Sequence, residues 1–261
     1  MVPPRTPSLL MTTSKSPTST HNPRAVVCLP TYNERENLEA MVRALGDVLD
    51  TSRDGVLIID DSSPDGTGAI ADRLASEMPW VSVLHREQKE GIGPAYIAGF
   101  RHLLAGDTEL VLEMDCDFSH DPGDVSRLIA AASEADLVLG SRYVNGGGTE
   151  NWGLLRRFVS RGGCIYAQVL LGVRVRDLTG GFKCFRRETL EAIDLDALSA
   201  HGYAFQIETT YRVLRKGLRV QEIPIRFIER RAGESKMTGS IVAEAIWKVP
   251  LLRLRALMGR L

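Results

Sequence analysis

The apolar run Leu-Val-Leu-Glu at residues 110–113 is followed at once by two carboxylates, Asp115 and Asp117. The run has the length and composition of a buried strand, and Asp121-Pro122 behind it can end that strand and begin a helix. In an open α/β sheet, ligands bind outside the carboxyl ends of the strands. Two hard oxygen ligands at such a point suit Mg²⁺ or Mn²⁺ on a phosphorylated substrate. This stretch therefore predicts a metal and phosphate site on an α/β sheet.

An Asp-x-Asp pair is by itself a weak motif, because aspartate also caps many helices and turns. There is also a geometric condition. Residues two apart on a regular strand share a face without converging, so the chain must bend near Asp117 if both oxygens are to reach one ion. Other parts of the sequence are needed to distinguish a metal site from a helix cap or turn cap.

Strand-type and helix-type segments alternate from residue 25 to residue 140. Apolar runs predict strands at 25–30, 56–61, 80–84, 110–113 and 136–140, and amphipathic patterns at 38–45, 70–74, 96–104 and 122–133 predict helices between them. This alternation indicates a mainly parallel, doubly wound sheet with helices on both faces. The expected fold class is thus α/β and Rossmann-like.

The second half of the chain is less regular. After Gly146-Gly147-Gly148 come a long amphipathic segment at 154–171, a helical pattern near 204–216 and a strand pattern at 219–227. Pro224 lies inside that last pattern, and because proline cannot donate a backbone hydrogen bond, we expect an edge strand there. Residues 240–261 form a basic amphipathic pattern with no acidic residue after Glu244 and a kink expected at Pro250. Such a helix can lie on an anionic membrane or pack on the core with a solvated basic face, and periodicity does not separate the two.

Composition limits the classes of protein to consider. With 261 residues, of which 44% are hydrophobic, the chain can bury one sizeable core. We expect a disordered Ser-, Thr- and Pro-rich tail at 1–22, one domain at 23–239 and a helix for membrane or partner contact at 240–261. The net charge of -1 gives no sign of nucleic-acid binding. No apolar run reaches membrane-spanning length. We therefore expect any reaction at a membrane to depend on contact with its surface or on a partner protein.

Polar or acidic residues end three of the predicted strands: Pro30-Thr31-Tyr32-Asn33-Glu34 after the first, Asp60-Asp61 after the second, and Asp115 with Asp117 after the fourth. Because the carboxyl ends of parallel strands lie on one edge of the sheet, these groups are expected to converge. A dehydrogenase could share the predicted fold, but it would need a GxGxxG turn after the first strand, and this turn is absent. The sequence also lacks the P-loop motif for binding phosphate. Phosphate charge is therefore expected to be neutralised by a metal and by arginines.

The ordered motifs at residues 28–34, 59–67, 114–120, 140–143 and 233–236 resemble the series found in family 2 glycosyltransferases, and within them in dolichol- and polyprenol-phosphate mannose synthases. The resemblance covers about residues 24–238. It implies a GT-A fold and inverting transfer of mannose from GDP-mannose to the phosphate of a polyprenyl (dolichyl-type) lipid.

The resemblance also implies the residues of the donor site. The nucleotide would be held by Pro30, Tyr32, Glu34, Ile59, Asp61 and the backbone of Cys116. The metal on the diphosphate would be held by Asp115 and Asp117, of which Asp117 is the firmer ligand. Ser119 stands where some family members carry a glutamine ligand, which leaves the third protein ligand open. Arg230 and Lys236 would close over the nucleotide.

For the acceptor, the resemblance implies that Arg142 reaches one of the phosphates and that the acceptor-phosphate region contains Arg156, Arg157, Ser160 and Arg161. The choice between Arg156 and Arg157 stays open. The acceptor is a phosphate monoester that is already largely anionic near neutral pH, so no strong general base is needed. Asp177 is therefore expected to order the wall of the site.

Two other functions stay open from the sequence. One is transfer from another donor, such as UDP-glucose, to a polyprenyl phosphate. The other is non-catalytic nucleotide-sugar binding, against which the Asp115/Asp117 pair and Arg142 argue. The expected location is the cytoplasmic face of a membrane, with peripheral attachment through the C-terminal helix, a multi-span membrane protein partner, or both.

Overall fold

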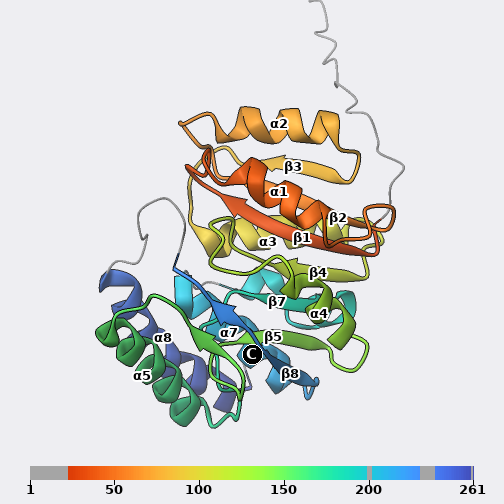
Figure 1. The fold of residues 1–261 in the computed structure, drawn as a ribbon. Helices are drawn as coiled ribbons and strands as arrows, with labels where there is room; N and C mark the ends of the chain where they lie inside the picture. Colours follow the sequence, from red (N-terminus) through yellow and green to blue (C-terminus); the bar gives the residue numbers. More distant parts are fainter. Residues whose placement is uncertain (1–22, 199–201, 230–238, 260) are drawn as a thin grey trace, which may run out of the picture.

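The computed structural model describes residues 23–198, 202–229, 239–259 and 261. Its centre is a seven-stranded sheet with the order β3-β2-β1-β4-β7-β5-β8 (Figure 1). The strands are β1 (Ala25–Thr31), β2 (Asp54–Asp60), β3 (Val81–His85), β4 (Leu110–Glu113), β5 (Leu137–Ser141), β7 (Lys183–Arg186) and β8 (Val220–Pro224). A separate two-stranded ribbon pairs β6 (Gly148–Thr149) with β9 (Arg226–Phe227). The predicted α/β sheet is confirmed.

Helices cover both faces of this sheet. One face carries α1 (Leu38–Gly46), α2 (Thr67–Glu77) and α4 (Asp124–Ala131), and the other carries α3 (Ile92–Leu104), α5 (Leu154–Leu171), α6 (Arg187–Ala192), α7 (Gly202–Arg215) and α8 (Gly239–Leu257). A short 3₁₀ turn, η1 (Leu195–Ala197), precedes α7. Because side chains alternate along a strand, β1 sends Val26 and Cys28 into one core and Val27 and Leu29 into the other. Two apolar layers thus hold the sheet from its two sides.

The strand order reverses between β1 and β4. The chain runs outward from β1 to β2 and β3 and then crosses back to place β4 on the other side of β1, with all four strands parallel. At such a switch point the crossovers lie on opposite faces of the sheet and leave a crevice at the carboxyl ends of the two central strands. The residues that follow β1 and β4 therefore border one opening.

The structure adds two features that the sequence did not predict. Strand β7 inserts antiparallel between β4 and β5, pairing Glu113 with Lys183 and Leu139 with Lys183 from its two sides. The predicted strand at 219–227 is divided after Pro224 into β8, which is the edge of the main sheet, and β9, which pairs with β6. The edge position expected from Pro224 is confirmed.

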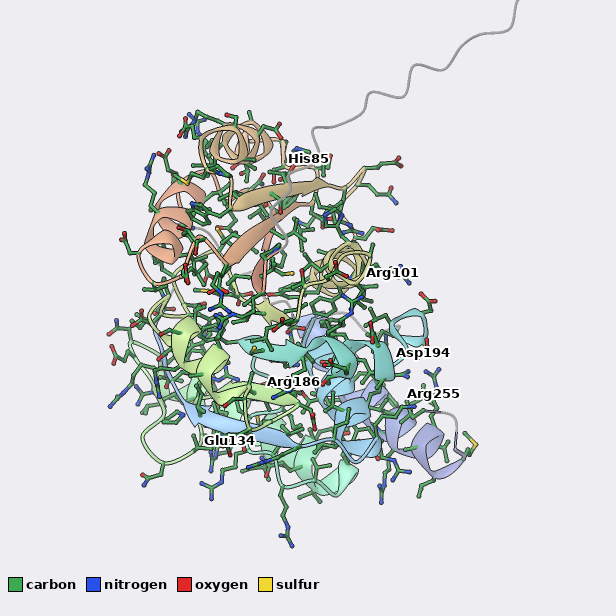
Figure 2. The ribbon with its side chains drawn as sticks, turned by 90° about the vertical axis from the view of Figure 1, so that its right-hand side faces the viewer. His85, Arg101, Glu134, Arg186, Asp194 and Arg255 are labelled. Carbon is green, nitrogen blue, oxygen red and sulfur yellow. The ribbon has the colours of Figure 1, made fainter. Side chains whose placement is uncertain are left out.

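Helices α5 and α8 pack against one another at the end of the molecule opposite to α2 (Figure 1). Val249, Leu252 and Ala256 of α8 are buried, at spacings that place them on one side of the helix. The basic side chain of Arg255 lies on the same helix, far from His85 at the other end of the molecule (Figure 2). Helix α8 therefore joins the core through one side and leaves another side uncovered.

Candidate active site

A pocket of about 410 Å³ opens at the switch point. Its wall is formed by Pro30 and Thr31 at the end of β1, by Tyr32 directly after it, by Asp115 and Asp117 after β4, and by residues from α3, α5, α7 and β9. The convergence expected from the strand ends is therefore present for β1, β2 and β4, whose following loops supply Tyr32, Asp61 and Asp117 to the same pocket.

The Asp115–Asp117 segment lies beyond the last paired residue of β4, so the bend required for convergent oxygens is present. Phe118 has a φ of 61°, which is unusual for a bulky residue and turns the chain sharply. The backbone N–H of Ser119 donates to Asp117 Oδ1 at 3.0 Å, and the N–H of Ile228 donates to the Ser119 carbonyl at 3.1 Å. The loop is thus held by its own carboxylate and by the chain that follows β9.

His120 supports the same loop, and sequence reasoning passed over it. The backbone N–H of Asp115 donates to His120 Nδ1 at 3.2 Å, which requires that nitrogen to be unprotonated. Burial lowers the pKa of His120 to about 4, so the ring is neutral at physiological pH. The ring stacks on Phe182 and meets Phe227 edge to face. His120 therefore acts as a positioning residue for Asp115.

One end of the pocket has the features of a nucleotide site. Lys89 Nζ lies 3.7 Å from the centre of the Tyr32 ring. The Asp61 carboxylate accepts from Arg86 and from the backbone N–H groups of Glu90 and Gly91, the latter two at 3.3 Å. Asp61 thus ties the loop that carries Lys89 to the end of β2. A flat aromatic ring, a carboxylate and a lysine are together suited to a nucleoside.

The other end of the pocket is cationic. Arg142 donates to Asp177 through Nε at 2.8 Å and Nη2 at 2.7 Å, and the Arg142 backbone N–H also donates to Asp177. Both side chains are buried. Burial alone would raise the pKa of the Asp177 carboxyl, but the charge and hydrogen bonds of Arg142 outweigh it and lower that pKa. Asp177 is therefore a carboxylate that holds Arg142 in place, in agreement with the ordering role expected of it.

The structure shows which of the two neighbouring arginines, Arg156 or Arg157, lines the pocket. Arg156 lines the pocket and stacks on the Trp152 ring at 4.1 Å, whereas Arg157 donates to the Thr149 carbonyl and does not line it. Ser160 accepts a hydrogen bond from the Tyr143 hydroxyl at 2.7 Å, and the guanidinium of Arg161 lies over the Tyr143 ring. Of the four residues proposed for the acceptor, only Arg156 among the described residues lines the pocket.

Other predicted residues lie beside the pocket instead of lining it. The Glu34 carboxylate accepts from Asn37 at 2.9 Å, and the side chains of Ile59 and Cys116 are buried in the two cores. Any ligand contact by Ile59 or Cys116 would therefore use the backbone, as the resemblance implied for Cys116. Arg230 and Lys236, together with the tail at 1–22, lie outside the described residues.

The residues present fit a divalent cation of the Mg²⁺ type. Asp115 and Asp117 supply hard oxygen atoms to the pocket, and the buried Ser119 Oγ has no hydrogen-bond partner among the described residues. Within the same part of the chain, no group of three or more His, Cys, Asp or Glu side chains is arranged for a metal. A two-carboxylate site is nevertheless typical for an ion that keeps several waters and binds substrate phosphates.

The remaining pocket residues come from segments far apart in the chain, and no local motif marked them. Among them are Lys89, Trp152, Thr179, Gly181, Gln206 and Phe227. The only available signals were the aromatic Trp152 before a helix rich in arginine and the glycine pair at 180–181. Their common position depends on the packing of α5, α7 and β9 around the sheet.

A switch-point pocket with paired carboxylates, a nucleoside end and a cationic end defines a nucleotide-sugar glycosyltransferase with the GT-A fold. The family model described as Glycosyl transferase family 2 matches residues 26–194, and the chain belongs to this family. It is 48% identical over 226 residues to the undecaprenyl-phosphate mannosyltransferase of Micrococcus luteus, covering 87% of this chain and 92% of that protein. It is 46% identical over 239 residues to the polyprenol monophosphomannose synthase of Mycolicibacterium smegmatis, covering 91% of this chain and 89% of that protein.

A dolichol-phosphate mannosyltransferase of Pyrococcus furiosus is 35% identical over 84% of this chain, which spans 60% of that protein. Among solved structures, glucosyl-3-phosphoglycerate synthase of Mycobacterium tuberculosis, bound to Mn²⁺, UDP-glucose and phosphoglyceric acid, matches with a TM-score of 0.67 and 19% identity, covering 90% of this chain and 81% of that one. This structural likeness confirms the fold.

Proposed function

We propose that this glycosyltransferase transfers mannose from GDP-mannose to the phosphate of a polyprenyl lipid. The observation that carries the proposal is the division of one pocket into a nucleoside end at Tyr32 and Asp61, a carboxylate pair at Asp115 and Asp117, and a buried cation at Arg142. A sugar nucleotide would span the first two parts, and an anionic acceptor would meet the third. The names of the mannosyltransferases to which the chain is similar support mannose as the sugar and a polyprenyl phosphate as the acceptor.

The proposed reaction is a single displacement. An oxygen of the acceptor phosphate forms a bond to the anomeric carbon of mannose, the bond from that carbon to the diphosphate oxygen breaks, and GDP leaves with the electron pair. A divalent cation held by Asp115 and Asp117 would stabilise the charge on the leaving diphosphate. Arg142, fixed by Asp177, and Arg156, stacked on Trp152, would orient the acceptor phosphate and lower its repulsion from the donor.

The function is tested by incubating the purified protein with labelled GDP-mannose, UDP-glucose or GDP-glucose and a polyprenyl phosphate in detergent, with Mn²⁺, with Mg²⁺ or with a chelator. Label should enter the lipid phase from GDP-mannose and only with a divalent cation. Transfer from UDP-glucose alone would replace the proposed donor. Binding of a sugar nucleotide without transfer would instead indicate a non-catalytic binding protein.

The exposed face of α5 and α8 supports binding of the protein to a membrane surface. In the described part of the chain, every large apolar side chain that is strongly exposed belongs to these helices or follows α8 directly, including Leu154 (82% exposed), Phe158 (78%) and Trp247 (79%). Basic residues accompany them, namely Arg157 and Arg161 on α5 and Lys248, Arg253 and Arg255 on α8. Exposed apolar groups beside basic ones are typical of helices that lie in the interface of anionic membranes.

No helix in the described residues combines the length and apolar character needed to cross a bilayer. We therefore propose peripheral attachment at the cytoplasmic face through the α5–α8 surface, formed by the exposed apolar residues of both helices. Trp152 and Arg156 belong to the pocket and flank the first residues of α5, next to the exposed Leu154, Leu155 and Phe158. The lipid tail could thus remain in the bilayer while its phosphate enters the pocket. A multi-span protein partner would cover the same surface.

Charging this surface is expected to detach the protein without harming the donor site. The variant Phe158→Glu/Trp247→Glu should lower the fraction bound to vesicles of phosphatidylglycerol and phosphatidylcholine at least about tenfold, because two large apolar side chains no longer enter the interface. Transfer to a long-chain polyprenyl phosphate in vesicles should fall in parallel. Vesicle co-sedimentation and transfer assays measure both effects.

The matched control is Ser76→Glu/Ser126→Glu, which adds the same charge on exposed positions of α2 and α4. This control should bind vesicles as the parent does. Affinity for GDP should be equal in all three proteins. Unchanged vesicle binding by the folded Phe158→Glu/Trp247→Glu variant would contradict the α5–α8 surface.

A further inference from the structure

Three buried polar atoms in the pocket wall have no hydrogen-bond partner among the described residues. They are Ser119 Oγ, Trp152 Nε1 and Gln206 Oε1. The three residues are respectively 2%, 6% and 4% exposed. Leaving such a group unpaired is unfavourable, and buried polar groups in native proteins are nearly always bonded to protein, water or ligand. These atoms therefore mark positions where a bound substrate can complete the hydrogen bonding.

The chemistry of each atom limits what it can meet. The indole N–H of Trp152 is a donor only, and it lies in the wall beside Arg142 and Arg156, where an anionic oxygen is expected. The Ser119 hydroxyl can donate or accept and stands next to the carboxylate pair. The amide oxygen of Gln206 is an acceptor only and so needs a donor from the ligand.

Few parts of the two substrates can supply that donor. The diphosphate and the acceptor phosphate are largely deprotonated near neutral pH and offer acceptors. The base and the ribose, whose hydroxyls are also donors, are expected at Tyr32 and Asp61, at the opposite end of the pocket from the Arg142 wall. The hydroxyl groups of the hexose are the donors that remain between the carboxylate pair and the arginines.

The position of Gln206 is closely fixed. Its backbone carbonyl accepts from Lys183 Nζ at 2.9 Å and from the hydroxyls of Thr209 and Thr210 at 3.2 and 3.1 Å. On its other side, a Cβ added to Gly181 would lie only 3.3 Å from Gln206 Nε2, so glycine lets the amide approach the pocket floor. The amide nitrogen thus lies beside Gly181, and the side chain also hydrogen-bonds the buried Glu113 carboxyl, while the amide oxygen has no partner among the described residues.

From these contacts we infer that Gln206 is a sugar-recognition residue, whose amide oxygen accepts a hydrogen bond from a hydroxyl of the transferred hexose. The inference rests on the proposed function only in requiring a nucleotide sugar as donor. Gln206 thereby contributes to the choice of sugar, because a site built around a substrate hydroxyl discriminates against donors that lack it or direct it elsewhere.

The test compares the nucleotide with and without its sugar. Gln206→Met keeps the length of the side chain and removes the acceptor. It should weaken binding of GDP-mannose about tenfold in the presence of Mn²⁺ while leaving the affinity for GDP unchanged, as measured by isothermal titration calorimetry. The control Gln221→Met makes the same replacement on edge strand β8, outside the pocket, and should change neither affinity.

Donor analogues that lack one mannose hydroxyl identify the partner group. The parent should bind one of these analogues about tenfold more weakly than GDP-mannose. The Gln206→Met variant should bind that analogue and GDP-mannose with equal affinity. This coupling between residue and hydroxyl is expected for a direct contact. Equal losses of GDP and GDP-mannose affinity, no loss at all, or no coupled analogue would each overturn the inference. If the parent binds a different sugar nucleotide, the proposed function fails, and the same comparison with that nucleotide and its sugar-free form still tests Gln206.

Discussion

Replacing Asp117 with alanine is expected to lower mannose transfer by roughly a thousandfold, the scale observed when a preorganised group that stabilises developing charge is removed. Asp117 reaches the pocket from the bend after β4, and its carboxylate also accepts from the Ser119 backbone. The variant should therefore lose both the proposed metal ligand and a support of the loop. Rates measured with labelled donor over a range of Mn²⁺ concentrations would check this.

Two further variants separate these effects. Asp117→Asn keeps an oxygen for the Ser119 N–H but removes the charge, so it should hold the loop and still lose Mn²⁺-dependent binding of GDP in calorimetry. Asp121→Asn makes the same change four residues later, at an exposed position that does not line the pocket, and should behave as the parent. An Asp117→Ala protein that transfers mannose without any divalent cation would refute the metal assignment.

The second large effect is expected at the buried pair of Arg142 and Asp177. Asp177→Ala leaves a guanidinium buried without its carboxylate, which typically costs about 3–5 kcal/mol of folding free energy. It also releases Arg142 from its fixed position in the pocket wall, where we propose that it meets the acceptor phosphate, so transfer should fall even where the protein remains folded. Denaturant unfolding and the transfer assay at low temperature measure the two effects.

A double replacement distinguishes stability from function at this site. Arg142→Met/Asp177→Leu removes both charges and should recover a large part of the lost stability, because no unpaired ion remains. It should not recover activity. Restored transfer in this double variant would show that the cation at residue 142 is dispensable.

The same pair predicts a pH dependence of stability. The folded-state pKa of Asp177 is lowered from its ordinary value of 3.8, so its contribution is fully present above that value and is lost as the pH falls through the lower folded pKa. The stability difference between the parent and Asp177→Asn should therefore be constant near neutrality and shrink only in strong acid. A difference that disappears between pH 5 and 7 would contradict this assignment.

Much of the framework followed from local patterns. Apolar runs ending in polar residues predicted β1, β2 and β4, and the parallel sheet then required Tyr32, Asp61 and Asp117 to meet at one edge. The bend after β4 followed from the need for convergent oxygens. These predictions succeeded because each depends on the periodicity of a few neighbouring residues and on general rules of α/β topology.

The sequence by itself thus determined the fold class, the edge of the sheet that carries the site and the carboxylate pair within it. Only the tertiary structure decided that Asp177 holds Arg142, that His120 supports Asp115, that Arg156 and not Arg157 lines the pocket, and that Gln206 presents an unpaired oxygen there. The contact of His120 with Asp115 lies within one loop, whereas the others depend on residues from different elements, brought together by the antiparallel insertion of β7 and the packing of α5 and α7. Contacts of this kind depend on three-dimensional packing, which leaves no periodic signal along the chain.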